Sequence, residues 1–168
     1  MKYLTVVRHG KAADPLRAAQ DFDRALTERG EKDSKAAARM VANLQPPADW
    51  CISSPAVRAR GTAATIADAL GPLLHLQYED AAYLASADTL LELLGKTPEE
   101  MEHVVLVGHN PGLEELVAGL CAGHALHVNL TMPTATVAHI ELEAFRWDQL
   151  RWGCGKLKLL APPKTCKK

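Results

Sequence analysis

The fold is decided most clearly by residues 103–120, which read HVVLVGHNPGLEELVAGL. After the opening His, four Val and Leu residues form a short apolar run that is typical of a buried strand. A Gly-His-Asn-Pro turn follows, and apolar residues then recur from Leu113 to Leu120 with the spacing of one helical face. We therefore expect a strand over 103–107 that leads through a tight loop into a helix over 112–120.

The same alternation of strand and helix extends through the rest of the chain. Short apolar runs alternate with segments whose apolar residues recur every three or four positions, and Pro or Gly ends several of them. Thr97-Pro98-Glu99-Glu100 places a capping residue, a proline at N1 and a Glu at N3, which predicts one further helical turn. Further strands are expected over 3–7, 50–53, 75–79, 137–142 and 156–160, and further helices from near 27, over about 59–70 and over about 86–94.

This alternation predicts an α/β fold. Parallel neighbours in a sheet need a crossover connection, which is usually a helix, so we expect a mostly parallel central sheet with helices on both faces. The last two strands are expected to run antiparallel. We expect one domain over residues 1–163, followed by a frayed, charged tail over 164–168.

Composition excludes several classes of protein. Nineteen Lys and Arg residues stand against 20 Asp and Glu residues, a net charge of −1, so no global field favours nucleic acid or an anionic membrane. No apolar run approaches the roughly 20 residues of a membrane span, and the opening residues are too short an apolar run for a signal peptide. We expect a cytoplasmic protein with no nucleic-acid or membrane partner.

No metal site is expected either. The four cysteines lie far apart, which argues against a disulfide framework or a four-thiolate zinc site. Cys121, His124 and His127 lack a fourth ligand at a usual zinc spacing, and a helix that ends at Gly123 explains their placement. The tryptophans and arginines of residues 146–152 are interpreted as core packing rather than as a base-stacking surface, since only 5% of the residues are aromatic.

Charged and polar side chains follow four of the expected strands. RHG (8–10) follows the first strand, SSPAVR (53–58) the second, and GHNPG (108–112) the fourth, while Glu79 closes the third. Because the carboxyl ends of parallel strands meet at one edge of a sheet, two arginines, two histidines and a carboxylate should converge there. Each residue alone is unremarkable, but the set suits a phosphoryl group.

Three of these segments together resemble the histidine phosphatase superfamily. They are Arg8-His9-Gly10, the run at 53–63 and the turn at 107–112, and they occur in the order and after the strands that the family shows. The short chain without an inserted cap, together with FDRALTERG (22–30) and YLASA (83–87), resembles the SixA-like phosphohistidine phosphatase branch, which usually has Pro where Ala25 stands. The resemblance implies a three-layer, phosphoglycerate mutase-like fold without a cap domain.

The resemblance also implies catalytic roles. His9 would attack phosphorus as a neutral imidazole and carry the phosphoryl group covalently, surrounded by Arg8, Arg58 and His109. The other ring nitrogen of His9 must donate to a fixed acceptor, and we expect a backbone carbonyl near Gly10. Beside a bound dianion the charged form of His109 is favoured, so it would donate to phosphoryl oxygens. No metal or other cofactor is required, because the arginines neutralise the charge.

The remaining assignments concern the leaving group and the phosphoryl oxygens. The family's general acid falls on Glu79 or Asp80, and for a phosphohistidine substrate a weakly placed acid would matter little. Gly10 and Gly112 would let the backbone approach the ligand, and the helix that begins near Gly112 would direct its free N–H groups at it. Asn110 and Thr134 would donate to phosphoryl oxygens.

We expect a metal-independent phosphatase that removes phosphate from phosphohistidine on a protein, for example a histidine phosphorelay domain. One alternative is a phosphatase of a small phosphoester, which would use the same residues. Another is a module that binds phosphorylated groups without turnover, which the presence of all four candidate catalytic residues disfavours. The sequence does not choose the partner.

Overall fold

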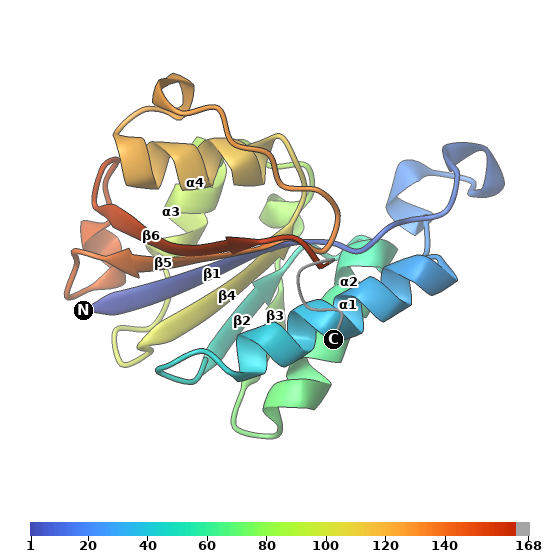
Figure 1. Cartoon of the computed structure of the whole chain (residues 1–168), viewed down its shortest axis with the longest axis horizontal. Helices are drawn as coiled ribbons and strands as arrows, with labels where there is room; N and C mark the ends of the chain where they lie inside the picture. Colours follow the sequence, from blue (N-terminus) through green and yellow to red (C-terminus); the bar gives the residue numbers. More distant parts are fainter. Residues whose placement is uncertain (164–168) are drawn as a thin grey trace.

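The structure is a computed structural model that describes residues 1–163. A six-stranded sheet forms its middle layer (Figure 1). Its strands are β1 (Lys2–Arg8), β2 (Trp50–Ser53), β3 (His75–Tyr78), β4 (His103–Gly108), β5 (Val137–Leu142) and β6 (Gly155–Ala161). The helices are α1 (Glu28–Ala42), α2 (Val57–Leu70), α3 (Ala87–Leu94) and α4 (Gly112–Ala122). Short 3₁₀ turns lie between them: η1 (Pro15–Arg17), η2 (Asp21–Asp23), η3 (Asp80–Ala82), η4 (Ala125–His127) and η5 (Trp147–Gln149).

The strand order is β3-β2-β4-β1-β5-β6, and the first four of these strands are parallel. β5 runs antiparallel to β1, and β6 antiparallel to β5. The predicted α/β class and the antiparallel last pair are therefore confirmed. In the parallel β1–β4 pair, Arg8 lies opposite Gly108, so the residues that follow these two strands emerge side by side.

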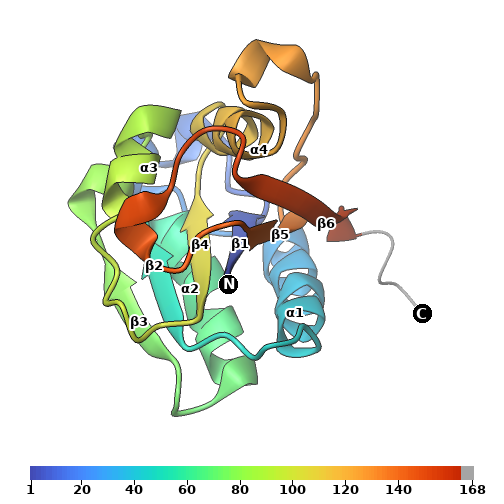
Figure 2. The same ribbon diagram turned by 90° about the vertical axis from the view of Figure 1, so that its left-hand side faces the viewer.

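Helices cover both faces of the sheet, as Figures 1 and 2 show. α3 and α4 pack on one face through a core that contains Leu4, Val6 and Leu106. α1 and α2 pack on the other face, against Val7 and Val105. Because successive side chains of a strand point to opposite faces, the unbroken apolar runs of β1 and β4 supply both cores at once.

Capping residues define the helix boundaries, close to the predicted positions. The Thr27 side chain accepts a hydrogen bond from the Gly30 N–H at 3.0 Å and begins α1, and Ser86 caps α3 in the same way. α2 ends at Gly71 and α4 at Gly123, whose positive φ angles of 84° and 82° are conformations that favour glycine.

The helical turn predicted at Thr97-Pro98-Glu99-Glu100 is wrong. These residues form turns and bends, and the Thr97 hydroxyl is buried without a hydrogen-bond partner instead of capping a helix. Tertiary contacts hold the segment in a non-helical conformation, because the Lys2 ammonium donates to the carbonyls of Glu99 and Met101 at 2.6 and 2.7 Å. The local capping pattern is thus overridden by a side chain about 100 positions away.

Two other expectations concern the termini and the membrane. None of the helices formed by residues 1–163 combines the length and the apolar character that a bilayer crossing needs. The expected frayed tail, residues 164–168, lies outside the described residues, as does Cys166. Cys51, Cys121 and Cys154 are free thiols.

Candidate active site

Four predicted residues meet beyond the carboxyl ends of the parallel strands. Arg8 is the last residue of β1 and His9 follows it, Arg58 lies in the first turn of α2, and His109 follows β4. We call these four residues the Arg–His cluster. His9, Arg58 and His109 are 8%, 3% and 3% exposed, so their mutual hydrogen bonds form in a largely desolvated setting.

The His9 ring is held in one tautomer. Its Nδ1 lies 2.7 Å from the Gly10 carbonyl oxygen, which can only accept, so Nδ1 carries the proton. Its Nε2 accepts from Arg58 Nε at 3.2 Å and therefore presents its lone pair to the cluster. Burial lowers the pKa of His9 to about 4, the Gly10 hydrogen bond opposes this effect, and Arg58 and Arg8 add to it. The expected backbone acceptor near Gly10 is confirmed, and the ring is a neutral potential nucleophile at pH 7.

Arg58 connects the two histidines to the η2 turn. Besides the contact with His9, its Nη2 lies 3.3 Å from His109 Nδ1, and its Nη1 donates to the Asp21 carbonyl at 2.7 Å. Nη2 also donates to Asp21 Oδ2 at 2.9 Å. All three nitrogens of the guanidinium are thus engaged, which fixes the plane of the group beside His9.

His109 is also neutral, with the opposite tautomer. Because Arg58 can only donate, His109 Nδ1 is an acceptor, and Nε2–H donates to Ser54 Oγ at 2.7 Å. Burial lowers the pKa of His109 to about 3, with further lowering by His9 and Arg58. The neutral form of His109 is therefore favoured here, and the charged form expected beside a bound dianion stays a prediction. Ser54, which was not among the predicted site residues, is the residue that orients this ring.

Arg8 and Asn110 are tied to the segment before β5. Arg8 Nη1 donates to the Met132 carbonyl at 3.0 Å, while Arg8 Nε is buried without a partner. The Asn110 amide donates to the same carbonyl and to Glu114 Oε1, both at 2.9 Å. Both amide donors of Asn110 therefore hold the chain at Met132, and its buried Oδ1 is left without a partner. In this arrangement Asn110 positions Arg8 rather than presenting its own N–H groups.

Gly10 and Gly112 were expected to let the backbone approach a ligand, but the structure gives a different reason why these two positions require glycine. A Cβ on Gly10 would lie 2.5 Å from the Gly30 carbonyl oxygen, and one on Gly112 would lie 2.0 Å from the Ala85 carbonyl oxygen. The space beside each glycine is therefore filled by protein backbone, and the Gly10 N–H donates to Thr62 Oγ1 at 3.0 Å. Both glycines permit close packing of the elements that carry the Arg–His cluster.

The structure does not bring Glu79 to the cluster. Its carboxylate accepts a hydrogen bond from Gln77 and lines a cavity with Trp50, Ile52 and Lys96, on the α3 side of the sheet. The alternation of side chains explains this: Gln77 and Glu79 share one face of β3, whereas Tyr78 points to α2 and packs under Arg60. The assignment of Glu79 as general acid is therefore not supported by its position.

Two other predicted residues lie near the cluster without a side-chain contact to it. Asp80 is exposed and begins the η3 turn. Thr134 is half-buried in the turn before β5, where the neighbouring Ala135 N–H donates to the Arg8 and His9 carbonyls at 3.0 and 3.1 Å. This turn thus supports the backbone of β1, and Thr134 belongs to it through its backbone.

Asp21 and Tyr83 were not among the predicted site residues. Tyr83 Oη donates to Asp21 Oδ2 at 2.7 Å, the same oxygen that Arg58 contacts. The Tyr83 ring also lies edge-on to His109, with ring centroids 5.4 Å apart. Asp21 directly precedes the segment FDRALTERG and Tyr83 is the first residue of YLASA, but an acidic residue in a turn carries no signal of its own.

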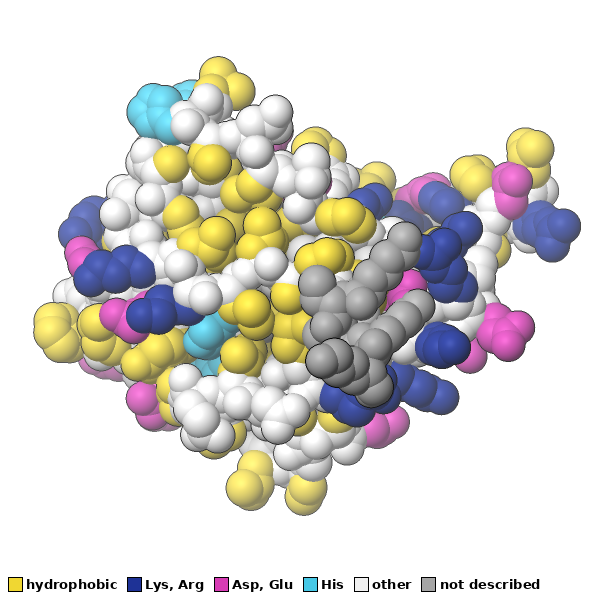
Figure 3. All heavy atoms as spheres, in the orientation of Figure 1, with side chains coloured by type: hydrophobic (Ala, Val, Ile, Leu, Met, Phe, Trp, Pro, Cys, Tyr) yellow, Lys and Arg dark blue, Asp and Glu magenta, His cyan; other side chains and the backbone are white. Residues whose placement is uncertain are grey.

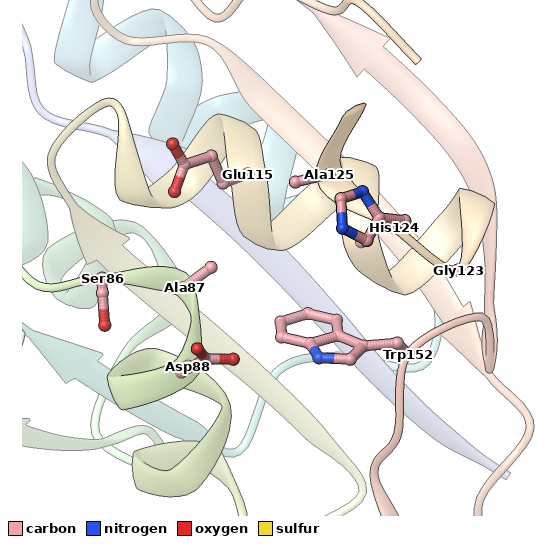
Figure 4. A pocket seen from close by; sticks show the side chains of 9 residues that line it. Ser86, Ala87, Asp88, Glu115, Gly123, His124, Ala125 and Trp152 are labelled. Carbon is pink, nitrogen blue, oxygen red and sulfur yellow. The ribbon is translucent and has the colours of Figure 1, made fainter. Parts of the chain in front are cut away.

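A separate cavity of about 210 Å³ lies between α3, α4 and Trp152 (Figure 4). His124 lies at its rim beyond the end of α4, and its Nδ1 accepts from the Leu126 N–H at 3.1 Å. His127 Nδ1 donates to the Ala122 carbonyl at 3.0 Å, so both imidazoles close the helix terminus, as expected from Gly123. Within residues 1–163 no three His, Cys, Asp or Glu side chains are grouped as metal ligands would be.

Positive charge is local rather than global. Figure 3 shows Lys and Arg side chains gathered at the right of the molecule, where α1 and the segment before it lie in Figure 1, with Asp and Glu between them. A second group of Lys, Arg, Asp and Glu side chains lies at the left of this face, and the surface between the two groups is mostly apolar and uncharged. This distribution agrees with the net charge of −1.

Comparison with known proteins agrees with this geometry. Residues 4–83 match the model of the histidine phosphatase superfamily (branch 1). An uncharacterized protein of Picosynechococcus sp. is 33% identical over 158 residues, which cover 86% of this chain and 94% of that protein.

Solved structures narrow the resemblance. A protein from Agrobacterium tumefaciens described as a phosphohistidine phosphatase, SixA, has a TM-score of 0.80 and 27% identity over 96% of this chain and 98% of its own. A SixA from Nakamurella multipartitia, described in the same way, has a TM-score of 0.80 and 25% identity over 96% of both chains. The chain therefore belongs to the histidine phosphatase superfamily, in its SixA-like branch, and is a phosphatase.

Proposed function

We propose that this phosphatase removes the phosphoryl group from phosphohistidine on a partner protein, through a covalent intermediate on His9. The observation that carries the proposal is the fixed tautomer of His9: Nδ1–H is held by the Gly10 carbonyl at 2.7 Å, and the Nε2 lone pair faces Arg58. A neutral ring whose proton is held on Nδ1 keeps its lone pair on Nε2, and this is the form that attacks phosphorus.

In the first step His9 Nε2 forms a bond to phosphorus while the bond between phosphorus and the leaving nitrogen breaks. The electron pair of that bond goes to the leaving imidazole, which departs neutral when its distal nitrogen already carries a proton. Arg58 and Arg8 supply fixed positive charge to the three equatorial oxygens. The phosphorylated His9 ring is formally cationic, and the Gly10 carbonyl stabilises it by accepting from Nδ1–H.

In the second step water attacks phosphorus and the electron pair returns to His9 Nε2. The ring is then neutral again, with its proton still on Nδ1, and inorganic phosphate leaves with the proton that the water releases. The two steps mirror each other, since an imidazole leaves in both. Neither step requires a proton to be delivered to the departing nitrogen, provided that its ring holds one at the distal position.

The placement of the carboxylates favours phosphohistidine over an alkyl phosphate. An alkyl leaving group needs a general acid, but Glu79 lies elsewhere, and Tyr83, Arg24 and Arg58 hold the pKa of Asp21 well below its usual range. A protonated imidazole leaves without such an acid. The SixA proteins from Agrobacterium and Nakamurella, described as phosphohistidine phosphatases, support the same substrate class.

The test is to trap the intermediate. The protein is mixed with phosphoramidate, quenched in alkali, where phosphohistidine survives, and weighed intact before peptide mapping. We expect one phosphoryl group on the peptide that contains His9, and none on the His9→Ala variant. The matched control is His139→Gln, which removes another buried histidine far from the cluster and should leave labelling unchanged.

Two further outcomes would redirect the proposal. Because Arg8 and Arg58 neutralise the phosphoryl charge, turnover should survive a chelator, and a loss that metal restores would contradict metal independence. Labelling of His9 combined with turnover of small phosphoesters but not of a phosphohistidine protein would assign the enzyme to small phosphoesters. No labelling and no release of phosphate would indicate a binding module.

A further inference from the structure

Asp21 places a carboxylate directly against the Arg–His cluster. It begins η2, in the segment between β1 and α1, and its Oδ2 accepts from Arg58 Nη2 at 2.9 Å and from Tyr83 Oη at 2.7 Å. Its Oδ1 accepts from Arg24 Nη1 at 3.0 Å, and its backbone carbonyl accepts from Arg58 Nη1 at 2.7 Å. Four hydrogen bonds thus position one exposed turn residue against a buried guanidinium.

This carboxylate is a fixed negative charge. The Tyr83 hydrogen bond is the largest cause of a pKa far below the usual range for Asp21, and hydrogen bonds from Arg24 and Arg58 add to it. The side chain of Asp21 is 43% exposed, whereas that of Arg58 is 3% exposed, so the anion lies between the cluster and solvent. Any group attached to a phosphoryl at His9 must therefore lie close to it.

Aromatic rings border the same approach. Phe22 and Tyr83 are packed edge to face with ring centroids 5.2 Å apart, and Tyr83 lies edge-on to His109. Phe22 follows Asp21 in η2, so one short turn contributes both a carboxylate and an aromatic ring. A flat ring with an N–H group is complementary to this border, whereas an aliphatic carboxylate is not.

We propose that Asp21 is a specificity-determining residue that selects leaving groups by charge. The inference rests on the proposed function and names the feature of the substrate that this site distinguishes. Asp21 favours an imidazole whose distal nitrogen carries a proton, because the carboxylate stabilises the positive ring that takes up the electron pair of the P–N bond and leaves as neutral imidazole. It disfavours phosphoesters with a negative group beside the phosphoryl, because that group meets a second anion at the rim.

The test compares three substrates in two variants, the isosteric Asp21→Asn and the charge-conserving Asp21→Glu. Phosphoimidazole carries the favoured ring, phosphoglycolate carries a carboxylate, and phenyl phosphate is the reference without either charge. For Asp21→Asn we expect kcat/KM to fall about tenfold for phosphoimidazole and to rise about tenfold for phosphoglycolate, with phenyl phosphate between them. Asp21→Glu should restore part of the original ratio, which a loss of folding would not allow.

Asp23→Asn is the matched control. Asp23 lies in the same η2 turn, is exposed and has the same charge, so its removal tests for a general effect of surface charge. Selectivity should remain unchanged in this variant. Inhibition constants for phosphoglycolate and for phosphate give a second readout that needs no turnover, and their ratio should fall in Asp21→Asn.

Equal changes for all three substrates would overturn the inference and would indicate that Asp21 only positions Arg58. Unchanged selectivity and unchanged inhibition constants would also overturn it. In both cases trapped phosphate on His9 would leave the proposed function intact. The absence of that label would instead refute the proposed function itself, so the two failures are distinguishable.

Discussion

Two pairs of buried histidines lie toward opposite ends of the same sheet. His9 and His109 follow the carboxyl ends of β1 and β4, with ring centroids 5.1 Å apart and a tilt of 54°. His103 begins β4 and His139 lies in β5, with ring centroids 5.2 Å apart and a tilt of 58°. The spacing and tilt of the rings are nearly the same, so neither property distinguishes a catalytic pair from a structural one.

The group that connects the rings is what differs. At the carboxyl end it is the Arg58 guanidinium, which leaves the lone pairs of both rings facing a cation. At the amino end it is the Thr5 hydroxyl, which contacts His103 Nε2 at 2.7 Å and His139 Nδ1 at 2.9 Å. Since His103 Nδ1 lies 2.7 Å from the Pro46 carbonyl oxygen, the hydrogen bonds run from His139 through Thr5 and His103 to that oxygen.

The comparison teaches that a depressed pKa does not identify a nucleophile. Burial is the largest cause of the lowered pKa in all four histidines, including His139, whose pKa falls to about 4. What sets His9 apart is a lone pair directed at a cation that can hold a phosphoryl group. Both ring nitrogens of His103 are engaged too, but their partners are uncharged groups, the Thr5 hydroxyl and the Pro46 carbonyl.

Removal of the nucleophile should have the largest effect. His9→Ala should lower kcat/KM by about 10⁴-fold or more while thermal unfolding remains cooperative, because only this ring accepts the phosphoryl group. Steady-state kinetics and calorimetry on the same preparation check this. His139→Gln should show the reverse pattern, with lower stability and retained turnover. A fully active His9→Ala variant would remove the functional distinction between the two pairs.

Replacement of the connecting cation should have the next largest effect. Arg58→Lys keeps the charge but cannot reproduce contacts to His9, His109 and Asp21 from three separate nitrogens. Transition-state stabilisation should fall by about 2 kcal/mol or more, which is about 30-fold in kcat/KM. Single-turnover rates with the trapped intermediate provide the measurement. Kinetics equal to those of the parent protein would place Arg58 outside the reaction.

At the opposite end, Thr5→Val removes the connecting hydroxyl without a change of shape. It leaves buried nitrogens of His103 and His139 without partners, so the free energy of unfolding should fall by about 2 kcal/mol. Urea titration measures this loss, and kcat/KM should stay within a factor of two or so of the parent value, because no reacting group changes. A loss of activity at unchanged stability would show that the amino-end pair is coupled to catalysis.

The last prediction concerns the dependence of stability on pH. The pKa values of His9, His109 and His139 are about 4, 3 and 4 in the folded protein, against about 6.5 when unfolded. The unfolded chain therefore binds more protons between these values. Stability should be lost as pH falls below about 6.5, by up to about 1.4 kcal/mol per pH unit for each group.

An added oxyanion distinguishes the contributions of the two histidine pairs to this pH dependence. Sulfate stays a dianion over this range and should raise the pKa of His9 and His109 when it binds beside them, while His103 and His139 are unaffected. The slope of unfolding free energy against pH, from urea titrations at pH 5 to 6.5, should therefore be shallower in sulfate than in chloride. Equal slopes would mean that no anion binds beside His9.

Much of the architecture was predictable because the signals are local. The strand predicted over 137–142 has the observed bounds, and the helices end at the glycines that predicted their ends. The Arg–His cluster was predictable for a related reason. Once RHG, SSPAVR and GHNPG each follow a parallel strand, the sheet brings their side chains to one edge.

The errors arise where side-chain direction or a distant contact decides. Glu79 ends the expected strand, but alternation along β3 turns it to the α3 side with Gln77. Thr97 has a good capping pattern, which Lys2 overrides by binding the carbonyls of the following turn. Asp21 was not predicted, because its place in the site depends entirely on contacts with Arg58 and Tyr83, which lie far along the chain.

By itself the sequence determined the order of the strands and long helices, the family, and the meeting of the Arg–His cluster at one edge of the sheet. Apolar periodicity and glycine or proline stops act over a few residues, so they can be read from the chain alone. Only the tertiary structure decided which nitrogen of His9 carries the proton, which histidine ring is held by Ser54, and which carboxylate forms the ion pair with Arg58. These choices depend on hydrogen bonds of 2.7 to 3.2 Å between groups as much as 55 residues apart, and no local pattern specifies such distances.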